Sequence, residues 1–169
     1  TLLNLQFVIN IKNIKRINLI MNNKYINFYN NLVNLTRNKI LYKEFTKRDT
    51  FSDRLVIFLF HFAFFLSIFK SKVKKNTLQE IFDYFFKQLE LSIREIGYGD
   101  ASINKKMKLY VNIFYSILSK IENWDNAAKF EKNKIFSEYI DLDENSLLLS
   151  EYFDIYIEYL RKNTFNSLL

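Results

Sequence analysis

Both glycines of this 169-residue chain fall within one stretch, EIGYGDASINKKMK, residues 95–108. Gly97 and Gly99 are followed at once by Asp100, and three lysines come within the next eight residues: Lys105, Lys106 and Lys108. Such a stretch could bind a nucleotide, but it follows a predicted helix and not a strand, so we reject that interpretation. Lysines in the first turns of a helix oppose its dipole. They therefore indicate either an anionic partner or ordinary solubilisation of the surface.

His61 is the single histidine, and the chain has no cysteine, which excludes thiol chemistry, disulfides and cysteine metal sites. Catalysis or metal binding would have to combine His61 with an acid such as Asp49 or Asp100. No P-loop, dinucleotide or zinc-protease motif is present. His61 lies within LVIFLFHFAFFLSIF, residues 55–69, where a charged imidazolium would be poorly solvated. We predict a buried histidine with no metal, no cofactor and no enzymatic activity.

The net charge of +7 is unevenly distributed. Residues 21–108 carry sixteen basic and eight acidic groups, whereas residues 109–169 carry six basic and ten acidic groups. A basic front half predicts a surface that attracts anions, such as RNA, the ribosome or anionic lipid headgroups. Charge alone does not separate these partners.

Elements that position these groups are predicted to be helices. The chain has no proline, and 49% of its residues are apolar. Apolar residues recur at helical spacing from residue 25 to residue 160. We predict an all-α fold, a single compact bundle of six or seven helices, with one helix over residues 124–140 that turns Phe130 inward. The apolar run 55–69 is shorter than the roughly 20 residues of a membrane span. It is predicted to be the central helix of the bundle, with a membrane-dipping helix as the alternative.

Helix ends are also marked in the sequence. Asp49 or Thr50 could cap the central helix.

The helix before the glycines is predicted to start at Thr77, because Thr77 and Glu80 have the spacing of a capping box. Gly97 should end that helix at positive φ, and Gly99 should let the chain turn sharply. Ser102 is predicted to cap the next helix.

The first residues do not fit the rest of the chain. The sequence begins at Thr1, and Met21 opens a helical pattern. We interpret residues 1–20 as upstream read-through or a disordered extension, with a targeting peptide as the alternative. The folded domain is predicted to comprise residues 21–169.

Two stretches resemble the signatures of the ubiquinol–cytochrome c chaperone family. RDTFSDRLVIFLFHFAFFLSIFK, residues 48–70, carries four of the family's residues: Asp49, Thr50, Arg54 and His61. REIGYGDASINKKMKLYVNIFYSIL, residues 94–118, carries more of them: Arg94, Glu95, Gly97, Gly99, Asp100, Lys105, Lys106, Lys108, Phe114 and Tyr115. The chain departs from the pattern at Asp53 (glycine expected), Asn104 (proline expected) and Ser116-Ile117 (Gly-Arg expected). The resemblance extends over residues 25–159.

This resemblance implies a non-catalytic, all-α assembly factor of the cytochrome bc1 complex. It implies binding of newly made cytochrome b, a position near the ribosomal exit tunnel, peripheral membrane contact and no DNA partner. The expected location is the cytoplasmic side of a bacterial inner membrane, or the matrix side in an organelle. The implied partner-binding residues are Asp49, Arg54, Arg94, Gly97, Gly99, Asp100, Lys105, Lys106, Lys108 and Tyr115.

Three hypotheses make different structural predictions. A chaperone should have an apolar groove next to the lysines. An enzyme should have His61 in an open polar pocket. A basic helical protein of unrelated role, bound to membrane surfaces or RNA, should have a continuous basic face without a groove.

Overall fold

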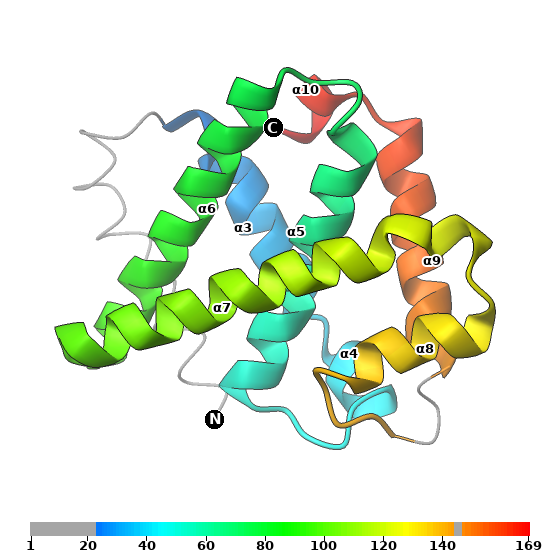
Figure 1. The fold of residues 1–169 in the computed structure, drawn as a ribbon, viewed down its shortest axis with the longest axis horizontal. Coiled ribbons are helices and arrows are strands. Elements are labelled where there is room, and N and C mark those ends of the chain that lie inside the picture. Colours follow the sequence, from blue (N-terminus) through cyan, green and yellow to red (C-terminus); the bar gives the residue numbers. More distant parts are fainter. Residues whose placement is uncertain (1–22, 144–146) are drawn as a thin grey trace.

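The computed structural model describes residues 23–143 and 147–169, and these form a helical bundle (Figure 1). The elements are η1 (Asn23–Tyr25), α3 (Ile26–Thr36), α4 (Lys39–Glu44), α5 (Phe51–Phe69), α6 (Lys75–Glu95), α7 (Asp100–Lys120), η2 (Ile121–Asn126), α8 (Lys129–Ser137), α9 (Leu147–Lys162) and α10 (Phe165–Leu168). Six of these helices have nine residues or more, as predicted. The described ranges contain no strand, only an isolated antiparallel bridge between Thr46 and Leu142. The extension predicted for residues 1–20 lies outside them.

Helix α5 is the centre of the bundle, which confirms the prediction. Helices α3, α7 and α9 all pack against it, and α7 crosses it in Figure 1 with α3 and α9 on either side. Because neighbours cover α5 on several sides, its sequence is apolar all round. Phe62 on α5 is fully buried and stacks on Phe85 of α6, with ring centroids 4.2 Å apart, and on Phe114 of α7, at 5.2 Å.

Helix α5 also has the length and composition of a membrane span, and no other helix of the described residues does. Its mean hydropathy reaches 1.7, but 67% of that window is buried inside the bundle. Burial of this kind is the property of a core helix, so length and hydropathy are weak evidence for a span.

The start of α5 is fixed by a capping box. The Thr50 hydroxyl accepts a hydrogen bond from the Asp53 backbone N–H at 3.1 Å, and the Asp53 carboxylate accepts one from the Thr50 N–H at 3.1 Å. Of the two candidate caps, Thr50 is therefore the correct one. Asp53, which stands where the family has glycine, completes the box.

The capping box predicted for Thr77 and Glu80 is wrong. Helix α6 begins at Lys75, and its N-cap Lys74 makes no side-chain cap hydrogen bond. The Thr77 backbone N–H already donates to the Lys74 carbonyl at 3.0 Å, so Thr77 lies inside the helix. The Glu80 carboxylate instead accepts a hydrogen bond from the Tyr25 hydroxyl at 2.8 Å.

The single helix predicted over residues 124–140 is also wrong. Ala127 and Ala128 have extended backbone angles and separate η2 from α8. The Ala128 backbone N–H donates to the Glu131 carboxylate at 2.7 Å, which marks a new helix start. Because the chain changes direction here, Phe130 is 74% exposed and not turned inward.

Candidate functional site

The first group of predicted site residues meets at the start of α5. The Arg54 guanidinium donates to both carboxylate oxygens of Asp49, at 2.6 Å for the Nη2 to Oδ2 bond. It lies over the Tyr42 ring, 4.6 Å from its centroid, and Arg54 is only 4% exposed. The hydrogen bonds that Arg54 donates to Asp49 raise the pKa of Arg54. A partner at this point would meet Asp49, because Arg54 is enclosed.

The second group of predicted site residues lies at the connection between α6 and α7. Arg94, at the end of α6, donates to Glu90 one turn earlier, at 2.9 Å, and also pairs with Asp100 at the start of α7. Partial burial acts to raise the pKa of Glu90, but hydrogen bonds from Arg94 and Lys87 lower it overall. Arg94 therefore bridges two helices, and both acids lie beside it.

The two glycines of this connection have different roles. Gly97 has φ of +99°, as predicted for the residue that ends α6. Gly99 is the N-cap of α7 with φ of −72° and ψ of 160°, a conformation open to any residue. The sharp turn thus depends on Gly97 alone. Because α7 begins at Asp100, Ser102 lies within the helix, and its predicted capping role is wrong.

Serine at Gly97 is expected to lower the free energy of unfolding by about 1–2 kcal/mol, because L-residues resist positive φ. Serine at Gly99 is a matched control. A Cβ atom at either glycine would meet nothing within 4 Å, so only the backbone angles differ. Serine is a favourable N-cap, so Gly99→Ser should change stability by no more than about 0.5 kcal/mol. Urea unfolding of both variants measures the difference. Equal losses would contradict the role given to Gly97.

The three lysines lie beyond the first turn of α7. Lys105 and Lys108 are exposed, and the Lys106 ammonium lies 4.5 Å from the centroid of the Tyr98 ring. The helix dipole acts mainly within the first turn. Since α7 begins at Asp100, the argument that these lysines oppose the dipole is wrong. The exposure of Lys105 and Lys108, and not the helix dipole, is therefore the reason to expect an anionic partner at these lysines.

Tyr115 lies on a different part of α7. Its side chain is 55% exposed and borders Phe82 of α6, with ring centroids 5.8 Å apart. Leu118 and Ser119 follow at helical spacing on the same face. Tyr115 therefore stands one turn from the groove described next.

An apolar groove of about 380 Å³ opens where α5, α6 and α7 meet. Its lining residues are Leu66, Ser67, Lys70, Leu78, Leu118, Ser119 and Glu122. The Lys70 ammonium lies 3.8 Å from the Glu122 carboxylate, and both side chains are mostly exposed. The groove thus offers leucines from three helices beside an exposed ion pair.

The position of this groove agrees in part with the chaperone hypothesis. It adjoins Lys70, which begins the basic connection between α5 and α6. Lys108 and Leu118 are ten residues apart on α7, or about 15 Å along the helix. The groove therefore does not adjoin the lysines of α7. The sequence does not reveal this groove, because its leucines follow the same helical spacing as core residues, whereas in the structure they are only partly buried.

His61 is completely buried, as predicted. Its Nδ1 lies 2.8 Å from the Ile57 carbonyl oxygen, and its Nε2 lies 2.7 Å from the Tyr152 hydroxyl. Burial lowers the pKa of His61 to about 4. The open polar pocket that the enzyme hypothesis requires is not found at His61. Among the described residues, no group of three or more acids and histidines could hold a metal.

The comparison with protein families decides between the remaining hypotheses. The model of the ubiquinol–cytochrome C chaperone family matches residues 43–131, which is more than half of the chain. The chain belongs to the ubiquinol–cytochrome c chaperone family. Comparison with curated proteins and with solved structures gave no match. Membership indicates a chaperone role connected with a respiratory complex.

The match to this chaperone family is shorter than the resemblance inferred from the sequence. It begins in α4 and ends in α8, whereas the resemblance extended over residues 25–159. It includes all predicted site residues and the groove between α5, α6 and α7. Helices α3 and α9 lie outside it.

Proposed function

We propose that this chaperone binds newly made cytochrome b during biogenesis of the cytochrome bc1 complex, and that it holds an apolar segment of this client in the groove between α5, α6 and α7. The observation that carries the proposal is an apolar groove within the residues that match the family. At about 380 Å³ the groove is at the small end of ligand pockets, roughly 300–1,000 Å³. It therefore fits a few side chains of a client helix.

The charges around the groove support work at a membrane surface. Four lysines occupy the end of α5 and the start of α6: Lys70, Lys72, Lys74 and Lys75. All four are exposed. Each cation near an anionic leaflet contributes about 1 kcal/mol of attraction. The proposed location is therefore the cytoplasmic face of the inner membrane, or the matrix face in an organelle, where a client segment can reach the groove as it leaves the ribosome.

A charge placed in the groove tests the client site. Ser119 is exposed and lines the groove, so Ser119→Lys should fill it without loss of core packing. We expect reduced co-purification of cytochrome b with the tagged variant and an unchanged melting temperature. Phe130→Lys adds the same charge at a 74% exposed position and should capture the client normally. Equal capture by both variants would show that the client binds elsewhere.

The lysines of α7 are tested separately, as a surface for the ribosome or for lipid headgroups. We expect glutamine at Lys105, Lys106 and Lys108 to weaken association with cytochrome b or its translating ribosome, most clearly at low salt. Stability should fall by no more than about 1 kcal/mol, the contribution of the Lys106–Tyr98 contact.

A matched control removes three other exposed lysines, by glutamine at Lys39, Lys43 and Lys134. Both triple variants lower the net charge by the same amount. If they capture the client equally, the lysines of α7 only keep the protein soluble.

A further inference from the structure

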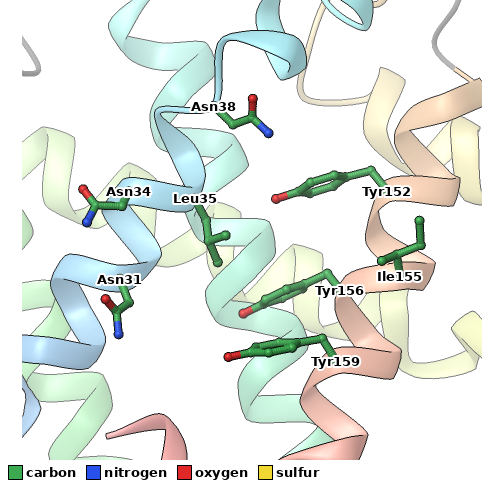
Figure 2. A pocket seen from close by; sticks show the side chains of 8 residues that line it. All are labelled: Asn31, Asn34, Leu35, Asn38, Tyr152, Ile155, Tyr156 and Tyr159. Atoms are coloured by element: carbon green, nitrogen blue, oxygen red, sulfur yellow. The ribbon is translucent and has the colours of Figure 1, made fainter.

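A second, larger groove lies between α3 and α9 (Figure 2). Its volume is about 770 Å³, and it is lined by Asn31, Asn34, Leu35, Asn38, Tyr152, Ile155, Tyr156 and Tyr159. Both walls lie outside the residues that match the chaperone family. Neither the family nor the proposed function accounts for it.

No charged residue lines this groove, although a quarter of the chain is charged. Helix α3 has the sequence INFYNNLVNLT, without an acid or a base. A chain with a net charge of +7 repels cationic partners and its own copies over most of its surface. An uncharged face is where two such copies can approach each other.

Hydrogen bonds inside the protein fix the polarity of the groove. A carbonyl oxygen only accepts, so His61 Nδ1 carries the hydrogen that bonds Ile57, and Nε2 accepts from the Tyr152 hydroxyl. The Tyr156 hydroxyl donates to the His61 carbonyl at 3.3 Å. The hydroxyl oxygens of Tyr152 and Tyr156 on the α9 wall therefore remain hydrogen-bond acceptors.

The opposite wall, formed by α3 and its connection to α4, offers a hydrogen-bond donor. The Asn38 side-chain oxygen accepts a hydrogen bond from the Ile40 backbone N–H at 3.1 Å. Its amide NH₂ group is left as a donor, and Figure 2 shows this side chain, which is the N-cap of α4, facing the groove from the connection after α3. An occupant that both donates and accepts hydrogen bonds, as asparagine does, therefore matches both walls.

The dimensions of the groove fit a helix. The α9 wall extends over eight residues, from Tyr152 to Tyr159, or about 10 Å of helix, and the other wall extends from Asn31 on α3 to Asn38 in the connection to α4. A groove of about 770 Å³ between two helices has room for side chains of a third helix, which is about 10 Å across with its side chains. An extended strand would need only about 5 by 10 Å.

We propose that a second copy of this chain occupies the groove, with α3 of each copy lying between α3 and α9 of the other about a two-fold axis. Helix α3 is itself an uncharged helix whose outer face carries asparagine amides beside Leu35. In an isologous contact of this kind both copies use the same surface, so each groove is filled by helix α3 of the other copy. It also covers apolar side chains that the single chain exposes: Leu35 (37%), Ile155 (72%) and Tyr159 (52%).

Sedimentation velocity or light scattering after gel filtration tests this dimer. We expect the parent protein to be a dimer, and Asn34→Lys or Tyr159→Lys to weaken dimerisation by about a hundredfold or more, because each puts an unpaired cation into both halves of the contact. Both positions are exposed, so the melting temperature of the monomer should be retained. Phe130→Lys should remain a dimer. A monomeric parent, or variants that all remain dimers, would overturn the proposal.

The absence of cysteine allows a second, geometric test. In this arrangement the two α3 helices lie side by side, so a cysteine at Asn34 should meet its counterpart. Asn34→Cys is expected to form a covalent dimer on mild oxidation, and Phe130→Cys is expected not to. Equal cross-linking at both positions would show random collision, and no cross-link at Asn34 would exclude the α3 contact.

Discussion

Alanine at Asp49 is expected to lower the free energy of unfolding by about 3 kcal/mol. The substitution leaves the Arg54 guanidinium, which is 4% exposed, without its carboxylate partner. Loss of one partner from a buried pair costs about 3–5 kcal/mol. Because the Asp49 side chain keeps 35% of its surface exposed, water can reach the pair, and the lower end of that range applies. Urea unfolding with two optical probes measures the change.

Two variants separate this ion pair from a general effect of lost charge. Asp141→Ala removes an acid that pairs with Arg48 at 3.2 Å, but both of those side chains are about half exposed or more. Such a surface pair contributes about 1 kcal/mol or less. Adding Arg54→Met to Asp49→Ala should restore most of the lost stability, because no unpaired cation remains. If Asp49→Ala costs no more than Asp141→Ala, the enclosed pair does not hold the start of α5.

The same variants connect the fold to the candidate site. If Asp49 only holds α5, cytochrome b capture and stability should fall together in Asp49→Ala and recover together in the double variant. If Asp49 also contacts the client, capture should remain low after stability is restored. The comparison therefore shows whether Asp49 contributes to stability alone or also to client binding.

The central helix could be predicted from the sequence because its signal is local and complete. A run of fifteen residues, thirteen of them apolar, can be covered on all sides only inside a bundle, and Thr50 caps the helix that contains it. The positive φ of Gly97 was predicted for the same reason, since the end of an amphipathic stripe coincides with a glycine. Both inferences needed only neighbours in the sequence.

The mistaken predictions depended on residues far apart in the sequence. Thr77 and Glu80 have the spacing of a capping box, but Tyr25, 55 residues before Glu80, binds its carboxylate. Phe130 continues a helical pattern, yet the chain bends at Ala127 and Ala128 just before it. Local patterns cannot report such tertiary competition.

Some parts of the candidate site could likewise be predicted from the sequence, and others could not. The resemblance named Asp49, Arg54, Arg94 and Asp100 as site residues, and the structure shows that they form two ion pairs, Asp49 with Arg54 and Arg94 with Asp100. The grooves could not be predicted, because each depends on how far packed helices stand apart. Leu66, Leu78 and Leu118 come from three helices, and no sequence spacing relates them.

Acid is expected to destabilise the protein through His61. Burial lowers the pKa of His61 in the folded protein to about 4, against an ordinary value of 6.5. Above pH 6.5 the imidazole is neutral in both the folded and the unfolded chain, so it does not affect stability. Below pH 6.5 the unfolded chain takes up a proton that the folded chain cannot accept, and stability falls until the pH reaches about 4. The loss should be about 2 kcal/mol at pH 5 and about 3 kcal/mol at pH 4, since one pKa unit is 1.36 kcal/mol.

The His61→Gln variant isolates this effect from the carboxylates, which also lose their ion pairs in acid. Glutamine keeps a hydrogen-bond donor and acceptor near Ile57 and Tyr152 but does not titrate. The variant should be less stable than the parent at pH 7, because its amide fits the site less well. Between pH 7 and pH 5 its unfolding free energy should fall by about 2 kcal/mol less than that of the parent. Parallel curves in this range would mean that His61 gains its proton in the folded protein, and that the core around α5 and α9 admits a charge.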